Sequence, residues 1–303
     1  MFSYHAVKDR PTLLLAMTSL THVEFEALQI TFQHVWDAYV KQAYQQRPDR
    51  ERQYGGGQLA STLVAIEDKL LFLLYYLKAY PLQEILAFEF DMAQSTANAW
   101  IHVLPPILQE ALDRGGFLPE RDPSQVVTAL DLTREQQVGI DGTERRRQRP
   151  SDPATQQDCY SGKKKTHTMK NLIIAGLGSR TVAYLSTTVA GRIHDKTLAD
   201  QERISYPPGI DLYQDTGFQG YAPAGVQTQQ PTKKPKGKDL SPDQRAENTL
   251  IASIRIGIEH IIAGIKRCRI VKEVFRNTKT YFDDLVIELA CGLHNFRMYH
   301  RYS

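Results

Sequence analysis

The chain has 303 residues, of which 42% are hydrophobic and 23% charged, with a formal net charge of +3. This length is enough for two domains, and the composition is ordinary for a soluble globular protein. The longest apolar run, residues 70–77, is too short to cross a bilayer. The three cysteines, Cys159, Cys268 and Cys291, lack the spacing of a zinc site or a disulfide framework. We therefore expect a cytoplasmic protein without a membrane segment.

The N-terminal part of the chain is predicted to be helical. Apolar residues recur at helical spacing over residues 21–43, where Thr21 is a plausible N-cap with Glu24 three residues later. The charged and glycine-rich stretch Gln45–Gln58 is expected to be a linker. Short packed helices are expected to follow, as far as about Leu112.

Residues 67–104 have the pattern of a helix-turn-helix. Pro81 opens a helix expected over residues 82–88, and after a break at 90–92 a second helix is expected from Gln94, ending at Pro105-Pro106. Short hydrogen-bonding side chains on the first turns of the second helix suit base edges and phosphates; they are Gln94, Ser95, Thr96 and Asn98. The alternative is a plain packing module, since any small helical bundle can contain a helix, a break and a helix.

After Gly115-Gly116 the pattern changes to short apolar runs separated by turns. Strands are expected at residues 138–143, 170–175, 181–185 and 210–217, with a helix at 195–203 and an irregular basic insertion at 222–242. A long helix is then expected from about Ser241 to Phe275. Together these elements predict an all-α domain over residues 1–116, followed by an α/β layer architecture over residues 117–303.

Positive charge is concentrated in two stretches. Residues 142–180 contain nine Lys or Arg against three acids, including Lys163, Lys164 and Lys165, and residues 233–238 add four Lys. Stretches of this kind suit a polyanion, because neutralising phosphates releases counterions. The alternative for each is a solvated surface loop.

Three carboxylates are placed where they could converge. Asp141 and Asp215 are each expected at the end of a strand and are followed by glycine, which would let a metal or a large substrate approach the backbone. Glu259 lies beside the apolar stripe of the long helix, on the same side as Arg255 and Lys266.

Clustered carboxylates repel one another unless a cation lies among them, and hard oxygen ligands favour Mg²⁺ or Mn²⁺. Two such ions could activate water or a 3′-hydroxyl against a phosphodiester. The alternatives are turn residues at Asp141 and Asp215, and an ion pair within the helix between Glu259 and Arg255.

Four segments occur in order along the second part of the chain. They are residues 139–144 (GIDGTE), residues 160–170 (YSGKKKTHTMK), residues 214–220 (QDTGFQG) and the spaced residues Arg255, Glu259 and Lys266. Together these segments resemble bacterial insertion-sequence transposases of the DDE superfamily, nearest the IS5 group. The N-terminal helical pattern resembles the helix-turn-helix that precedes the catalytic domain in that group.

This resemblance implies an RNase H-like catalytic fold and an enzyme that cuts and joins double-stranded DNA at terminal inverted repeats and at a target. It implies that Asp141, Asp215 and Glu259 hold divalent metal, and that Lys266 and Arg255 belong to a helix signature whose Lys contacts transposon-end DNA. The signature often has Tyr three residues before the Arg, where this chain has Ala252. A homodimer or higher oligomer on DNA is expected.

Two other functions are compatible with the same residues. One is a catalytically silent DNA-binding derivative, domesticated or regulatory, which would bind inverted repeats without nicking them. The other is an RNase H-like nuclease that releases cut DNA without joining it. The basic stretches do not separate these alternatives, since each of them needs a polyanion.

Overall fold

The computed structural model describes residues 2–46, 62–237 and 239–302, and the chain forms two compact units. The first unit comprises Met1–Leu118, Arg267–Val271 and Leu285–Ser303, and the second comprises Pro119–Lys266 and Lys272–Asp284. The linker predicted at Gln45–Gln58 lies outside the described residues from position 47 onward.

The N-terminal part of the first unit is helical, as predicted. Its helices are α1 (Tyr4–Val7), α2 (Pro11–Thr18), α3 (His22–Gln45), α4 (Ile66–Ala79), α5 (Gln83–Glu89) and α6 (Gln94–Arg114). Helix α3 begins with the predicted capping box. The Glu24 N–H donates to the Thr21 hydroxyl at 3.3 Å, and the Thr21 N–H donates to the Glu24 carboxylate at 2.6 Å. These bonds satisfy two of the donors that a helix start leaves without partners.

Helices α5 and α6 form the predicted helix-turn-helix, with the turn at the predicted break. Asp91 adopts a left-handed backbone with φ of 53°, and the Met92 N–H donates to the Ala87 carbonyl at 2.9 Å. Ala87, Phe90 and Ala97 are buried between the helices. Small side chains at two of these three positions allow α5 and α6 to approach closely across the turn.

Helix α6 continues to Arg114, so the predicted end at Pro105-Pro106 is wrong. A proline inside a helix loses a backbone hydrogen bond and costs about 3 kcal/mol. The helix nevertheless continues because one side of it stays buried beyond the prolines, at Ile107, Leu108, Ala111 and Leu112. Burying that stripe stabilises the helix more than the two prolines weaken it, since each large aliphatic side chain contributes roughly 1.5–3 kcal/mol.

A buried lysine joins three helices of this unit. The Lys69 ammonium on α4 donates to the Val64 carbonyl at 2.6 Å and lies 5.0 Å from the ring centroid of Trp36 on α3 and 5.8 Å from that of Trp100 on α6. Burial lowers the pKa of Lys69. The two indole rings and the carbonyl stabilise the charged form, which fixes α6 against the rest of the unit.

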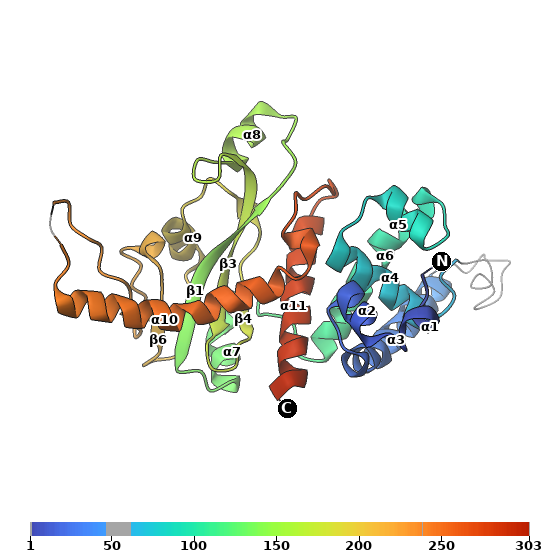
Figure 1. Cartoon of the computed structure of the whole chain (residues 1–303), viewed down its shortest axis with the longest axis horizontal. Coiled ribbons are helices and arrows are strands. Elements are labelled where there is room, and N and C mark those ends of the chain that lie inside the picture. The colour runs from blue at the N-terminus through green and yellow to red at the C-terminus, as the bar shows by residue number, and fades with distance from the viewer. Residues whose placement is uncertain (1, 47–61, 238, 303) are drawn as a thin grey trace. The chain divides into compact units, whose positions relative to one another are not determined.

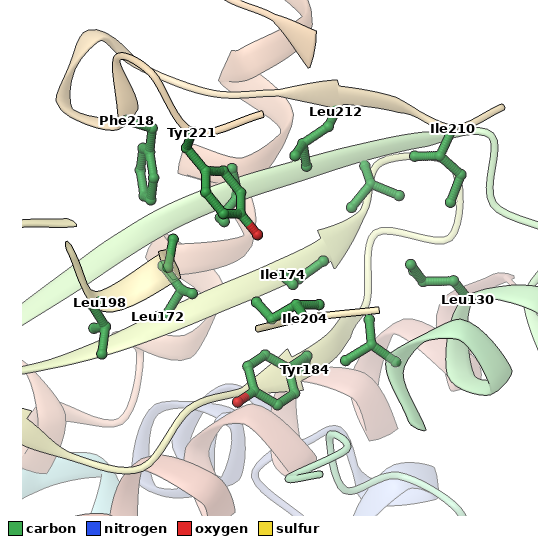
Figure 2. Close-up of a cluster of buried hydrophobic side chains, with 14 residues drawn as sticks. Leu130, Leu172, Ile174, Tyr184, Leu198, Ile204, Ile210, Leu212, Phe218 and Tyr221 are labelled. Atoms are coloured by element: carbon green, nitrogen blue, oxygen red, sulfur yellow. The ribbon is translucent and has the colours of Figure 1, made fainter. Parts of the chain in front are cut away.

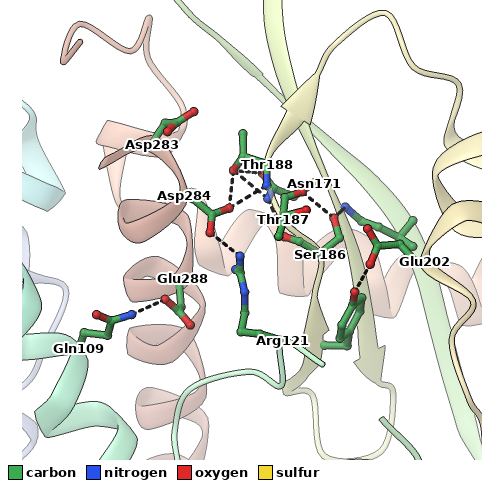
Figure 3. A network of polar contacts seen from close by, with 12 residues as sticks. Gln109, Arg121, Asn171, Ser186, Thr187, Thr188, Glu202, Asp283, Asp284 and Glu288 are labelled. Carbon is green, nitrogen blue, oxygen red and sulfur yellow. Dashed lines mark hydrogen bonds and ion pairs between the residues drawn. The ribbon is translucent and has the colours of Figure 1, made fainter. Parts of the chain in front are cut away.

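The C-terminal helix α11 (Phe282–Tyr302), which the sequence pattern did not reveal, contributes to the first unit from Leu285 onward. Phe296 packs edge-on against Phe117 with ring centroids 5.1 Å apart, and the Asn295 amide donates to the Phe117 carbonyl at 3.0 Å. Gln109 donates to Glu288 at 2.6 Å (Figure 3). The end of the chain therefore packs with the N-terminal helices, although the sequence assigned it to the second domain.

The second unit is built on a mixed seven-stranded sheet (Figure 1). Its strands are β1 (Gln137–Arg146), β2 (Tyr160–Ser161), β3 (Thr166–Gly176), β4 (Val182–Leu185), β5 (Val189–Ala190), β6 (Asp211–Tyr213) and β7 (Gln227–Gln229). The order is β2-β3-β1-β6-β7, with β4 and β5 also paired to β3. Strand β1 is antiparallel to β3 and parallel to β6. Antiparallel pairing on one side of β1 and parallel pairing on the other is the arrangement expected of an RNase H-like fold.

The helices of the second unit are α7 (Val126–Leu132), α8 (Pro153–Cys159), α9 (Asp195–Glu202) and α10 (Pro242–Ile265), with 3-10 turns at Pro123–Gln125 and Thr216–Phe218. The predicted helix at 195–203 and the predicted hairpin of β3 and β4 are confirmed. Strand β7 lies within the insertion predicted to be irregular.

Helix α10 starts at the capping box of Ser241 and Gln244 and ends at Ile265, ten residues before the predicted end at Phe275. The chain leaves the helix there because Arg267–Val271 joins the first unit. By length and composition α10 could cross a membrane. Four of its apolar residues, Ile251, Ile258, Ile261 and Ile265, are buried in the protein, whereas Leu250 and Ile256 are exposed.

The two faces of the sheet carry different layers. Val138 and Ile140 of β1 join Leu172, Ile174 and Leu212 in a core completed by α7 and α9 (Figure 2). Because side chains alternate along a strand, Gly139 and Asp141 face the opposite side. Helix α10 covers that side, and a Cβ at Gly139 would lie only 3.0 Å from the Ile258 Cβ. Asp141 therefore shares a face of the sheet with the helix that carries Glu259.

Candidate active site

An open cavity of about 1280 Å³ lies in the second unit and is lined by all three predicted carboxylates, Asp141, Asp215 and Glu259. Glu144 and Asp195 contribute two further carboxylates to its wall. Cations also line it: Arg149, Lys163, Lys164, Lys170, Arg192, Arg255 and Lys266. Acids and cations that lie far apart in the sequence thus share one open cavity.

The pairing of β1 and β6 brings the two aspartates side by side. Gly139 is the last residue of β1 that pairs with β6, opposite Tyr213. Asp141 and Asp215 each lie two residues farther on, and neighbouring strands run about 5 Å apart. The prediction that Asp141 ends its strand is wrong, because β1 continues to Arg146 and stays paired with β3. It is the strand β6 that ends here, and this opens the space beside Asp141.

Each aspartate is held by a neighbouring backbone N–H. The Gly142 N–H donates to the Asp141 carboxylate at 2.7 Å, and the Gly217 N–H donates to the Asp215 carboxylate at 2.7 Å. Burial raises the pKa of Asp141 to about 6, and the negative charges of Asp215 and Asp195 add to this effect. The Gly142 N–H and the Arg255 cation act in the opposite direction. Ionisation of Asp141 therefore destabilises the folded protein unless further positive charge lies nearby.

Glu259 reaches the cavity from α10, one residue after the buried Ile258 that packs on β1. Its side chain is exposed, and it makes no ion pair with Arg255, so the predicted alternative of an intrahelical pair is wrong for these two described residues. In the part of the chain that the structure describes, no three acids, cysteines or histidines lie close enough to hold a metal ion together. Asp141, Asp215 and Glu259 line the same cavity, but their carboxylates are too far apart in this structure to bind one metal ion together.

The sequence missed one ion pair in this cavity. Asp195, the first residue of α9, lies 2.9 Å from the Lys170 ammonium, which also donates to the Ile193 carbonyl at 2.7 Å. A Cβ at Gly142 would lie 2.4 Å from the Asp195 Oδ1, and a Cβ at Gly217 would lie 3.3 Å from its Oδ2.

Gly142 therefore makes room for the Asp195 carboxylate, and Gly217 makes room for the Asp215 carboxylate, whose Oδ1 would lie 2.8 Å from a Cβ there, as well as for Asp195. The sequence offered only a weak signal for Asp195, an acid at the start of a predicted helix. Its contacts depend on the pairing of strands that lie far apart in the chain.

The predicted DNA-binding cations of this unit divide into two groups. Arg255 and Lys266 line the cavity, and burial lowers the pKa of Lys266. The buried Nε of Arg255 has no hydrogen-bond partner among the described residues. Lys163, Lys164 and Lys165 are exposed on the tight turn between β2 and β3, and the first two line the cavity.

The predicted base-reading residues lie in the first unit, on the first turns of α6. Gln94 and Ser95 are exposed, and Thr96 and Asn98 are half-buried. Gln94 also donates to the side chain of Gln83 on α5 at 2.5 Å. No Lys or Arg occurs between Lys78 and Arg114, so contacts of this module with phosphates would have to come from neutral side chains and backbone N–H groups.

Comparison with known proteins agrees with both units. Residues 140–295 match the family "DDE superfamily endonuclease", and residues 61–113 match "Helix-turn-helix of DDE superfamily endonuclease". The chain is similar to the "Probable transposase for insertion sequence element IS702" of Microchaete diplosiphon, with 26% identity over 238 residues, which is 77% of this chain and 81% of the relative. No solved structure matches the chain significantly. Since the endonuclease family covers more than half of the sequence, the chain belongs to the DDE superfamily of endonucleases, a superfamily that generally uses divalent metals.

Proposed function

We propose that this endonuclease is the transposase of an insertion sequence, which cuts DNA at the terminal inverted repeats of its element and joins the freed ends to a target. The proposal is carried by the cavity that Asp141, Asp215 and Glu259 line together with Arg255 and Lys266. Similarity over most of the chain to a probable transposase of an insertion sequence supports it. The protein would act in the cytoplasm on chromosomal DNA, as a homodimer or higher oligomer that holds the ends of the element together.

The proposed metal ligands are Asp141, Asp215 and Glu259, holding Mg²⁺ or Mn²⁺, with two ions in the complete site. The donors fit such ions, since all are carboxylate oxygens. The raised pKa of Asp141 fits too, because a cation beside Asp141 and Asp215 would relieve the repulsion that contributes to it. When bound, the ions supply Lewis acidity and an activated water or 3′-hydroxyl for phosphodiester cleavage.

In this proposal Glu259 completes the ligand set when DNA and metal bind. It is exposed on α10, so its side chain can change rotamer without breaking a buried contact. Arg255 would hold the phosphate that reacts, since its buried Nε lies in the cavity wall without a partner among the described residues. Positioning and electrostatic stabilisation of this kind supply much of the rate in phosphodiester chemistry.

The proposed DNA contacts come from both units. Lys266, Lys163, Lys164 and Lys165 would neutralise backbone phosphates next to the cavity. Gln94, Ser95, Thr96 and Asn98 would face base edges and phosphates of the terminal repeat, in the manner of a recognition helix. The N–H groups of Gln94 and Ser95 at the start of α6 would contact phosphate, because the N-cap residue Ala93 provides no capping side chain.

The proposal is tested by incubating purified protein with a DNA fragment that carries the ends of the element. We expect cleavage and strand transfer in Mg²⁺ and none in EDTA. Asp215→Asn is expected to bind the fragment with unchanged affinity and to lose cleavage by at least about a thousandfold, which corresponds to about 4 kcal/mol. Undiminished cleavage by Asp215→Asn would rule out Asp141, Asp215 and Glu259 as the catalytic triad. If the wild type binds the fragment without nicking it, the protein is instead a catalytically silent DNA-binding derivative.

A further inference from the structure

The carboxylate site has a support on the face of the sheet opposite to α10. Along β1, Ile140 points into the core with α9, so Gly142 faces that side as well, while Asp141 faces α10. On β3, Leu172 points into the same core, so Lys170 also faces the α9 side. The ion pair of Asp195 and Lys170 therefore lies behind the two aspartates.

The Asp195 carboxylate lies between strand β1, which carries Asp141, and the turn after β6, which carries Asp215. Its Oδ1 occupies the place of a Cβ at Gly142, next to Asp141, and its Oδ2 approaches the place of a Cβ at Gly217, whose N–H holds Asp215. One side chain thus touches the backbone next to both aspartates. The two glycines are the residues that permit this contact.

The Asp195 side chain is itself fixed in place. Lys170 has a side-chain exposure of 9% and is held at 2.7 Å by the Ile193 carbonyl, two residues before Asp195. Across the strands Lys170 pairs with Glu144, whose carboxylate accepts from the Thr168 hydroxyl at 2.6 Å. A carboxylate already neutralised at 2.9 Å by a nearly buried ammonium is a weak candidate for a metal ligand and a good candidate for a rigid spacer.

We infer that Asp195, fixed by Lys170, is a positioning residue that sets the separation of Asp141 on β1 from the loop that carries Asp215, by filling the space at Gly142 and packing close to Gly217, without itself binding the metal. The inference rests on the proposed function, since it concerns the geometry of the same site. It assigns a role to Asp195, Lys170, Gly142 and Gly217 that family membership alone does not give.

The test is a double-mutant cycle between Gly142→Ala and Asp195→Ala. The added methyl group of Gly142→Ala cannot coexist with the Asp195 carboxylate at 2.4 Å, so either Asp195 leaves its position beside Lys170 or the β1 backbone next to Asp141 moves. We expect Mn²⁺ binding, measured by electron paramagnetic resonance without DNA, to weaken by at least about tenfold, or about 1.4 kcal/mol. The double variant is expected to recover most of this loss, because removing the Asp195 carboxylate restores the space.

Two further variants separate a spacer from a ligand. Asp195→Asn keeps the volume and should weaken Mn²⁺ binding much less than Asp215→Asn does. Asp200→Asn, on the exposed part of the same helix, is the matched control and should bind Mn²⁺ like the wild type. The inference is overturned if the double variant binds no better than Gly142→Ala, or if Asp195→Asn loses as much affinity as Asp215→Asn.

The same four proteins of the cycle are also compared by urea unfolding in EDTA, where no metal is involved. Coupling between the two substitutions is expected there as well, because the clash is present without metal, and absence of coupling overturns the inference. If the wild type neither binds Mn²⁺ nor cuts DNA, the proposed function fails, and the unfolding cycle still decides whether Asp195 is packed against Gly142 as inferred.

Discussion

Asp141 shows, for a single residue, how burial and neighbouring acids make an ionised carboxylate unfavourable in this cavity. Its carboxylate is buried beside Asp215 and Asp195, and its pKa is raised from 3.8 to about 6. A carboxyl whose pKa is higher in the folded state binds more protons there than in the unfolded chain over the window from about pH 4 to 6. Stability from this group is therefore present at low pH and lost as the pH rises through that window.

We predict that Asp141→Asn stabilises the metal-free protein near neutral pH. The shift of about two pKa units corresponds to about 3 kcal/mol, which the neutral amide does not lose. The gain should appear as the pH rises from about 4 to 7 and be small at pH 4, where Asp141 is protonated in both states. Urea unfolding in EDTA at several pH values measures it, with the exposed Asp200→Asn as control. A gain that does not change with pH would mean that Asp141 does not titrate in this window.

At the scale of elements, the turn between β2 and β3 brings three exposed cations to the rim of the cavity region. We predict that replacing Lys163, Lys164 and Lys165 by Ala weakens binding of all DNA sequences alike. The slope of log affinity against log salt should fall by up to about 3, since each phosphate contact contributes roughly 0.9. Filter binding or fluorescence anisotropy at several salt concentrations measures the slope.

The matched control for this set is Lys196→Ala, because Lys196 is an exposed lysine of the same unit that is already paired with Asp200 at 2.5 Å. Its salt slope should equal that of the wild type. An unchanged slope in the triple variant would show that the turn does not contact DNA.

Elements defined by local chemistry could be predicted from the sequence, and those defined by distant contacts could not. The start of α3 was predicted because Thr21 and Glu24 form a capping box within four residues. The end of α6 was missed because burial at Ile107 and Leu108 outweighs the local effect of Pro105 and Pro106. Helix α10 was predicted too long, since its end depends on where the following residues pack.

In the candidate site too, residues with a local sequence signal could be predicted, and residues placed by distant contacts could not. Asp141, Asp215 and Glu259 could be proposed from acids that end short apolar runs, from a helical stripe and from the resemblance to DDE transposases, and all three line one cavity. Asp195 and Lys170 could not, because their contact depends on the pairing of β1 with β3 and on α9 packing beneath them. The glycines after the acids were noticed in the sequence, but the atoms they accommodate are visible only in the fold.

At the scale of the whole molecule, the helix-turn-helix belongs to a unit that needs the far end of the chain. Both tryptophans, Trp36 and Trp100, lie in the first unit, so their fluorescence reports on that unit alone. Phe296 of α11 is 3% exposed and packs on Phe117. The stability of the DNA-recognition module should therefore depend on residues that the sequence assigned to the other domain.

We predict that Phe296→Ala destabilises the first unit by about 3–5 kcal/mol, as expected for a large aromatic side chain removed from a core. The urea midpoint of tryptophan fluorescence should fall accordingly. Phe88→Ala, at a position that is 86% exposed in the same unit, should stay within about 0.5 kcal/mol of the wild type. Equal midpoints for Phe296→Ala and the wild type would show that α11 does not support the helices of the first unit.

The second unit brings together a network that ties β1 and β3 to the segment before α11. Arg145 donates to the Asn171 side chain at 2.8 Å and to the Asp283 carbonyl at 2.9 Å. The Thr188 N–H donates to Asp284 at 2.8 Å (Figure 3). These bonds anchor residues 283–284 to the sheet directly before the chain enters the first unit. The catalytic unit is thus held together by polar contacts of its own as well as by its core.

The proposed metal site joins Asp141 on β1, Asp215 just beyond the end of β6 and Glu259 on α10 around divalent metal in one cavity. It is tested most directly by anomalous diffraction from Mn²⁺ in crystals of the protein bound to DNA carrying the ends of the element. The account predicts an anomalous peak at coordination distance from the carboxylates of Asp141, Asp215 and Glu259, next to a DNA phosphate. A peak held by other residues, or one from which Glu259 stays remote, would contradict it.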